Sequence, residues 1–141
     1  EAQGVDAAGP SPSLDAPDQA LLDRYVDAFQ RYDMAALTAV IHEDATQSMP
    51  PFELWLRGRE DILRFWEGPG AGCRSSRVLP ARAANGAPAF AQYKPSPGGD
   101  GYEPWALQVL DVRDGAIAGF TFFLATDAIF PLFGLPQRLP A

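Results

Sequence analysis

Only a few side chains in this sequence belong to the types that carry out metal, nucleophilic or acid–base chemistry. The chain has one histidine, His42, and one cysteine, Cys73. A catalytic metal needs several such ligands, so we predict no metal site and no cofactor. His42 falls at the end of a predicted helix, which favours a solvent-facing or dipole-stabilising role over that of a general base. Cys73 has no histidine or acid close to it in sequence, which favours a buried bystander thiol over a nucleophile.

The other candidates for a functional site are apolar and aromatic. Because side chains alternate along a strand, the odd-numbered residues from 105 to 109 are predicted to share one face, and so are the even-numbered residues from 120 to 124. Together with side chains from the first helix and the first two strands, they are candidates to line a cavity for a small ligand. These candidates are Tyr25, Met49, Trp55, Trp105, Leu107, Val109, Phe120, Phe122 and Leu124. The alternative is that they simply fill the core, and the sequence favours neither.

Three predicted helices come first among the elements that would position these residues. The first begins at about Pro17, and its apolar residues between Leu21 and Phe29 recur at helical spacing. Asp33 is a good N-cap for the second helix, which we expect to end near residues 42–44. The third helix covers about residues 60–66 and has acidic residues in its first turn, where they complement the helix dipole.

The rest of the chain reads as β-structure. Short strands are predicted at 45–49 and 52–56. Beyond Arg74, the pairs Asn85-Gly86 and Asp114-Gly115 are strong hairpin signals, and residues 97–101 form a longer turn. These three turns separate four predicted strands, 74–84, 87–94, 102–113 and 116–125. A short apolar piece comes after them at 128–133. Helices followed by an antiparallel meander indicate an α+β fold.

Composition limits the classes of protein that the chain can represent. Its 141 residues, 47% of them hydrophobic, fit one globular domain. The net charge of −7 disfavours direct contact with nucleic acid, and no apolar run is long enough to span a membrane. A single cysteine cannot form an internal disulfide, so the cytoplasm is the expected compartment.

The two ends of the sequence predict where the domain lies. Residues 1–16 are small, polar and rich in proline and glycine, so we expect a linker or disordered tail. The folded domain is expected at 17–136. Because the chain starts at Glu1 and not at methionine, we expect it to be a piece of a longer protein, with processing of the N-terminus as the alternative.

Several segments carry a family resemblance. Arg24-Tyr25-Val26-Asp27-Ala28-Phe29, with His42-Glu43-Asp44-Ala45-Thr46 and Trp55-Leu56-Arg57-Gly58 after it, resembles the opening of the SnoaL-like and ketosteroid-isomerase-like families. Their cone-shaped NTF2-like fold packs three helices on a strongly curved antiparallel sheet. A narrower set is similar to the C-terminal SnoaL-like domain of actinobacterial extracytoplasmic-function sigma factors. That set comprises 48–58, 68–74, 89–93, 101–110 and 130–136.

The resemblance also bears on catalysis. A ketosteroid-isomerase-like site needs a carboxylate base and an oxyanion hole made by a tyrosine and a protonated aspartate. Aligning the motif around Tyr25 puts Tyr25 at the family's tyrosine, but puts Met49 at the base and places the second acid near Val109. Both carboxylates are therefore missing. We expect Tyr25 to face the cavity among apolar neighbours, with no carboxylate in hydrogen-bond reach.

A second catalytic pattern of the fold fits no better. An epoxide-hydrolase-like site would need Arg57 and carboxylates such as Asp111 to converge on one water. Asp111 lies close to the Asp114-Gly115 turn, and a solvated strand end explains it better. We therefore predict no catalytic residue.

The resemblance implies a regulatory and binding domain of a sigma factor. Such a domain would modulate transcription initiation through contacts with the upstream sigma-factor domains or RNA polymerase, and a small apolar ligand would be a further partner. The alternative is a small SnoaL-like enzyme, an isomerase, cyclase or epoxide hydrolase that acts on a polycyclic or epoxide substrate. Two carboxylates, or a carboxylate and a histidine, converging inside the cone would favour the enzyme.

The last two long strands also predict a contact between copies of the chain. A sheet with one wet face alternates apolar with polar residues, whereas strands 102–113 and 116–125 are apolar on both faces. We therefore expect the isolated domain to form a homodimer through the sheet. The alternative is a monomer in which the C-terminal residues Ile129, Phe130, Leu132 and Phe133 cover this face.

Overall fold

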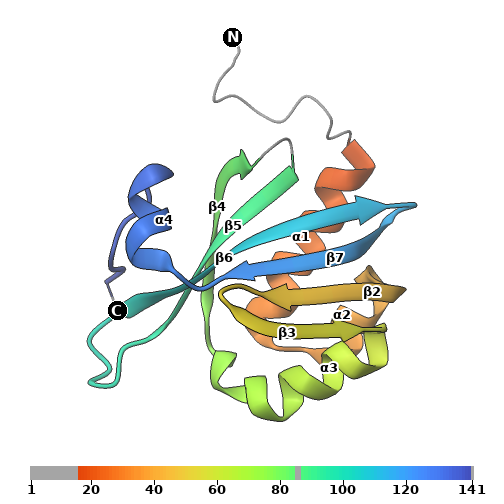
Figure 1. Ribbon diagram of the computed structural model, residues 1–141, viewed down its shortest axis with the longest axis horizontal. Helices are drawn as coiled ribbons and strands as arrows, with labels where there is room; N and C mark the ends of the chain where they lie inside the picture. The colour runs from red at the N-terminus through yellow and green to blue at the C-terminus, as the bar shows by residue number, and fades with distance from the viewer. Residues whose placement is uncertain (1–15, 85–86, 141) are drawn as a thin grey trace, which may run out of the picture.

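The computed structural model describes residues 16–84 and 87–140, with side chains at 18–81 and 87–140. Within this part, helices cover one face of a six-stranded sheet, and a further helix lies against the other face (Figure 1). The helices are α1 (Ala16–Arg31), α2 (Met34–Val40), α3 (Arg59–Glu67), the 3-10 turn η1 (Pro69–Cys73) and α4 (Thr126–Leu132). The strands are β2 (Ile41–Met49), β3 (Phe52–Arg57), β4 (Arg77–Ala84), β5 (Ala87–Pro95), β6 (Tyr102–Arg113) and β7 (Ala116–Phe123).

The sheet has the order β3-β2-β7-β6-β5-β4, and the predicted α+β class is confirmed. All neighbouring strands pair antiparallel except β2 and β7, which run parallel. Figure 1 shows a strong twist, since β4 and β5 run steeply across the view in which β2 and β3 lie almost flat. The sheet is therefore mixed, and α4 adds a helix to the three that were predicted.

The second helix is shorter than its apolar pattern predicted. Asp33 caps it as expected, because its side chain accepts a hydrogen bond from the backbone N–H of Ala36 at 3.1 Å. The helix ends at Val40, however, and Ile41 is extended and pairs with Ile117 of β7. The expected end near residues 42–44 is wrong, because strand pairing with β7 takes over at Ile41.

The predicted hairpin between the last two strands is confirmed. Asp114 and Gly115 both have positive φ, at 54° and 76°, as a two-residue turn between right-twisted strands requires. Strands β4 and β5 also pair antiparallel across Ala84 and Ala87, and the Asn85-Gly86 signal itself lies outside the described residues. Of the expected tail at 1–16, residues 1–15 lie outside them as well, and Ala16 begins α1.

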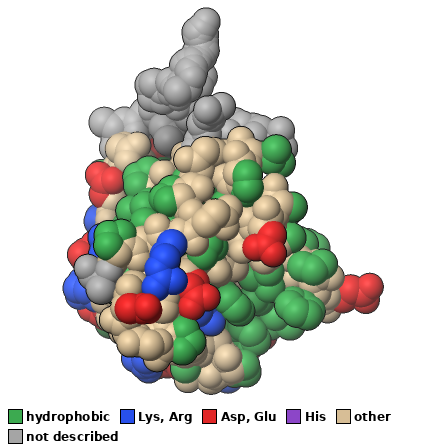
Figure 2. Space-filling model, turned by 90° about the vertical axis from the view of Figure 1, so that its left-hand side faces the viewer, with side chains coloured by type: hydrophobic (Ala, Val, Ile, Leu, Met, Phe, Trp, Pro, Cys, Tyr) green, Lys and Arg blue, Asp and Glu red, His purple; other side chains and the backbone are tan. Residues whose placement is uncertain are grey.

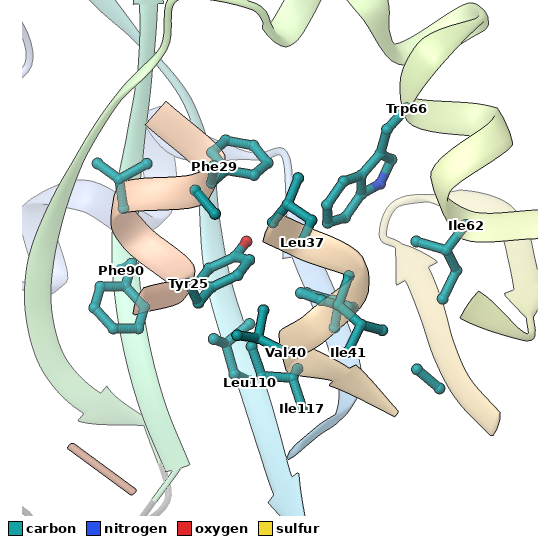
Figure 3. Packing of buried hydrophobic residues seen from close by; sticks show 14 of the residues in the cluster. Tyr25, Phe29, Leu37, Val40, Ile41, Ile62, Trp66, Phe90, Leu110 and Ile117 are labelled. Carbon is teal, nitrogen blue, oxygen red and sulfur yellow. The ribbon is translucent and has the colours of Figure 1, made fainter. Parts of the chain in front are cut away.

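The main core lies between the sheet and helices α1, α2 and α3. Figure 3 shows Tyr25 and Phe29 of α1 beside Leu37 of α2, facing Trp66 of α3 and strand residues such as Leu110. The rings of Phe29 and Trp66 meet edge to face with centroids 5.5 Å apart. This cluster holds the helices in a layer on one face of the sheet.

A second cluster lies on the opposite face, beneath α4. Phe130 of α4 is fully buried, and its ring meets that of Tyr93 with centroids 5.5 Å apart. The hydroxyl of Tyr93 donates to the carbonyl of Pro136 at 2.7 Å, which ties down the chain after α4. Leu132 is left 78% exposed, and Figure 2 shows this side with hydrophobic side chains spread around a small group of charged ones. The C-terminal segment therefore covers part of the outer face. No helix in the described part is long and apolar enough to cross a membrane.

Candidate functional site

A cavity of about 130 Å³ opens between α1, α3, η1 and the inner face of the sheet. Six of its lining residues are aromatic, Phe29, Tyr32, Phe65, Trp66, Trp105 and Phe122. The others are Gln47, Met49, Pro69, Gly70, Cys73 and Lys94. Lys94 is the one charged side chain in this set, and no acid or histidine belongs to it. The cavity is thus an apolar, aromatic space with a single cation at its wall.

A bulge in β6 places Trp105 in the cavity. Gln92 of β5 pairs with Ala106, but Tyr93 pairs with Pro104, so Trp105 is an extra residue without a partner in β5. Such a bulge redirects a side chain and shifts the alternation of the residues after it. Trp105 therefore lies on the same face as Ala106, and it packs against the main core.

Lys94 lies against the indole of Trp105. Its Nζ is 3.4 Å from the ring centroid, a cation–π contact. The indole Nε1 of Trp105 is itself buried and has no hydrogen-bond partner. The Lys94 ammonium above this ring is the one charged group among the residues that line the cavity.

Only some of the nine predicted lining residues reach this cavity. Met49, Trp105 and Phe122 line it. Tyr25 and Phe120 lie in the main core with their rings 5.7 Å apart. Leu124 is half-buried and packs against the same cluster.

The remaining three lie elsewhere, which corrects their predicted place. Leu107 and Val109 belong to the second cluster on the opposite face, because the bulge at Trp105 reverses the alternation that was expected to join them to Trp105. Trp55 pairs with Ser48 on β2 and is 73% exposed. It lines a shallow groove on the outer face instead, together with Thr46 and Thr121.

Tyr25 is fully buried and its hydroxyl is engaged by an amide. The hydroxyl donates to Oε1 of Gln108 at 2.5 Å, and Nε2 of Gln108 donates to Oε1 of Gln92 at 3.0 Å. Nε2 of Gln92 then donates to Oγ of Ser76 at 3.1 Å, and that hydroxyl donates to the carbonyl of Cys73 at 2.7 Å. We call these four side chains, Tyr25, Gln108, Gln92 and Ser76, the polar ladder.

The polar ladder corrects the expectation that Tyr25 has only apolar neighbours. Its partner is Gln108, and no hydrogen bond joins Tyr25 to a described carboxylate. Burial raises the pKa of Tyr25 well above its usual value, so the phenol stays protonated and acts as a donor. A hydroxyl already bound to a buried amide is not free to stabilise a substrate oxyanion.

Sequence reasoning missed the glutamines and Lys94. Gln47 accepts from the indole Nε1 of Trp66 at 2.6 Å, and it is buried like Gln92 and Gln108. Gln92 and Gln108 each stand alone among apolar residues of a strand, as in Ala-Phe-Ala-Gln-Tyr before Lys94. Isolated amides in apolar strands signal buried hydrogen bonds, because an unpaired buried amide is costly.

The other candidate residues for chemistry lie outside a common site. Nδ1 of His42 accepts from the backbone N–H of Asp44 at 3.0 Å. Asp111 is exposed and pairs with Arg113 at 3.2 Å, and Arg57 is exposed on β3. In the part of the chain that the structure describes, no three side chains of His, Cys, Asp or Glu gather as metal ligands would.

Cys73 lines the cavity, and its surroundings disfavour a nucleophile. Burial raises the pKa of the thiol, although a hydrogen bond with Gln92 and the charge of Lys94 oppose that effect. A thiol with a raised pKa carries little thiolate at neutral pH, and the thiolate is the reactive form.

The sequence also matches known proteins. The model of the SnoaL-like domain family matches residues 22–120. The ECF RNA polymerase sigma factor SigG of Mycobacterium tuberculosis is 36% identical over 132 residues, in both the CDC 1551/Oshkosh and the ATCC 25618/H37Rv strain. The match covers 89% of this chain and 35% of SigG, so the chain spans about a third of the length of these relatives.

Solved structures share the fold. TerC, crystallised with polyporic acid, superposes with a TM-score of 0.62 and 15% identity over 84% of this chain and 99% of its own. A candidate ketosteroid isomerase from Kribbella flavida DSM 17836 gives a TM-score of 0.59 and 24% identity, over 77% of each chain. These neighbours confirm the cone-shaped fold, and the family match covers most of the sequence. The chain belongs to the SnoaL-like domain family.

Proposed function

We propose that this chain is the regulatory C-terminal domain, at 17–136, of an extracytoplasmic-function RNA polymerase sigma factor. The observation that carries the proposal is the 36% identity to SigG over 89% of this chain. The domain modulates transcription initiation through contacts with the upstream sigma-factor domains or RNA polymerase, and it works in the cytoplasm with them. Its net charge of −7 fits a domain that does not itself touch DNA. Its cavity takes a small, largely apolar ligand that tunes those contacts.

The cavity supports a binding role better than an enzymatic one. A ketosteroid-isomerase-like or epoxide-hydrolase-like reaction needs carboxylates at the substrate, and none of the residues that line the cavity is acidic. Met49 lines it where the alignment expects the base. Tyr25 lies at the position of the family's tyrosine, but its hydroxyl already donates a hydrogen bond to Gln108.

Transcription in vitro tests the proposal. The complete reading frame that contains this chain should encode polymerase-binding helices upstream of it. We expect removal of residues 17–136 from that protein to change transcript yield from its promoter at least about fivefold, since coupling between sites is commonly worth 5–150-fold. The shortened protein should still bind core polymerase. A variant of the intact protein with the exposed Arg138 changed to alanine is the control. A reading frame without such helices, or an unchanged yield, contradicts the proposal.

We also propose that the isolated domain forms a homodimer through the outer face around Trp55. The C-terminal segment leaves this part of the sheet open, and a tryptophan that is 73% exposed favours a contact. Light scattering of the 141-residue chain should give twice the monomer mass, and Trp55→Lys should give the monomer. Ala35→Lys adds the same charge on the exposed side of α2 and should remain dimeric. A monomeric parent chain contradicts this part of the proposal.

A further inference from the structure

Lys94 is the only lysine of the chain, and it is placed as a ligand-binding group would be. It is half-buried, lines the cavity and lies over the ring of Trp105. Its Nζ forms no ion pair with a described carboxylate, unlike Arg31, Arg64, Arg113 and Arg138. A side chain on Gly72 would approach Nζ at 3.5 Å, so η1 also packs closely around it. Lys94 is thus a cation at the wall of an apolar cavity, without a counter-charge among the described carboxylates.

Trp105 provides a second group without a partner at the same place. Its Nε1–H is buried and makes no hydrogen bond. A buried donor without an acceptor is costly and usually has a reason, of which a missing ligand is one. Because Nε1 belongs to the ring that Lys94 covers, the cation and the N–H donor are neighbours. An ammonium group and an N–H donor together can bind the two oxygens of a carboxylate, which carries a single negative charge.

The size and walls of the cavity define the rest of the ligand. Aromatic side chains such as Phe29, Phe65 and Phe122 line the same cavity, which favours a flat, apolar body for the ligand. The free volume is about 130 Å³. An apolar cavity of about 150 Å³ holds benzene, so one aromatic ring is the scale that fits.

We propose that this cavity binds a small aromatic carboxylate, with its ring among the phenylalanines and its carboxylate between Lys94 and the indole N–H of Trp105. The inference rests on the proposed ligand-binding role of the domain and adds the chemical class of the ligand. The Cys73 thiol beside this site does not compete as an anion. Burial raises its pKa, so it is neutral at pH 7.

Binding of benzoate and of its neutral isostere benzamide to the 141-residue chain tests the proposal. Titration calorimetry should give a dissociation constant for benzoate below about 1 mM, in the range expected of a ligand with about nine heavy atoms. Benzamide should bind at least about tenfold more weakly, because charge-assisted hydrogen bonds are about twice as strong as neutral ones. Benzoate should also slow the alkylation of Cys73 by iodoacetamide, since both occupy the same cavity.

Variants separate the roles of charge and shape. Lys94→Met removes the charge but keeps a side chain of similar length. It should raise the dissociation constant of benzoate at least about tenfold and change that of benzamide by less than about twofold. Lys94→Arg should retain benzoate, and Arg138→Met, which removes an exposed cation, should bind it like the parent chain. Thermal unfolding of each variant checks that the fold is intact.

Two results would overturn the inference. Equal binding of benzoate and benzamide, unaffected by Lys94→Met, would show an apolar cavity without a carboxylate site. Binding of neither probe, with no protection of Cys73, would show a cavity that is too small or closed. Neither result affects the transcription assay, which needs no ligand, so the sigma-factor proposal is tested independently of this inference.

Discussion

Replacing Phe120 with alanine is expected to destabilise the domain by about 3–5 kcal/mol, the usual cost of removing a buried phenylalanine. Phe120 is 2% exposed and joins the rings of Tyr25 at 5.7 Å and Trp66 at 5.2 Å. Its removal leaves a space at the point where α1, α3 and β7 meet. Such a loss is a large fraction of the stability of about 5–15 kcal/mol that a domain has.

Chemical unfolding in urea, followed by circular dichroism, measures this loss. Phe52→Ala is the matched control, because Phe52 is 67% exposed and the same truncation there should change the free energy of unfolding by less than about 0.5 kcal/mol. The melting temperature should fall by about 10–20 °C for Phe120→Ala. Equal free energies of unfolding for the two variants would mean that the Tyr25–Phe120–Trp66 contacts do not hold the layers together.

Local sequence signals were sufficient for most of the fold. The periodicity of Leu21 to Phe29, the cap at Asp33 and the Asp114-Gly115 turn each act over a few residues, and the structure has all three features. The end of α2 was misplaced because Ile41 fits a helix locally, while its pairing with Ile117 depends on a strand 76 positions later. Long-range pairing of this kind has no local signature.

Fewer of the residues that line the cavity could be predicted from the sequence, because a strand bulge changes which side chains face it. Strict alternation put Trp105, Leu107 and Val109 on one face, but the bulge at Trp105 adds one residue and reverses the facing of the residues after it. A bulge is set by the register with β5, which the sequence of β6 alone does not contain. Trp55 was placed in the cavity with the other aromatic residues, yet in β3 it pairs with Ser48 of β2 and its side chain is exposed.

The polar ladder gives Tyr25 a structural role that needs no oxyanion hole around it. In this domain the phenol is a structural donor, and Gln108 occupies the place where a substrate oxygen would need to lie. The amides of Gln108 and Gln92 continue the connection across β6 and β5 to Ser76, before β4 begins. A fully paired buried network of this kind fixes the register of strands, whereas a partly paired one is costly.

Gln108→Leu should therefore cost about 2–4 kcal/mol of stability, although leucine has a similar size and is more apolar. The loss arises because the substitution leaves both the Tyr25 hydroxyl and Oε1 of Gln92 buried without hydrogen-bond partners. Tyr25→Phe alone should cost about 1–2 kcal/mol, since it orphans only Oε1 of Gln108. The double variant should be at least about 1 kcal/mol more stable than the sum of the single losses predicts, because the phenol and its acceptor disappear together.

Gln19→Leu, which breaks an exposed hydrogen bond to Asp23, is the control and should change stability by less than about 0.5 kcal/mol. Urea unfolding of the parent chain and these four variants measures the cycle. Strict additivity of the two losses would show that Tyr25 and Gln108 are not coupled, and that the tyrosine hydroxyl is free for another role.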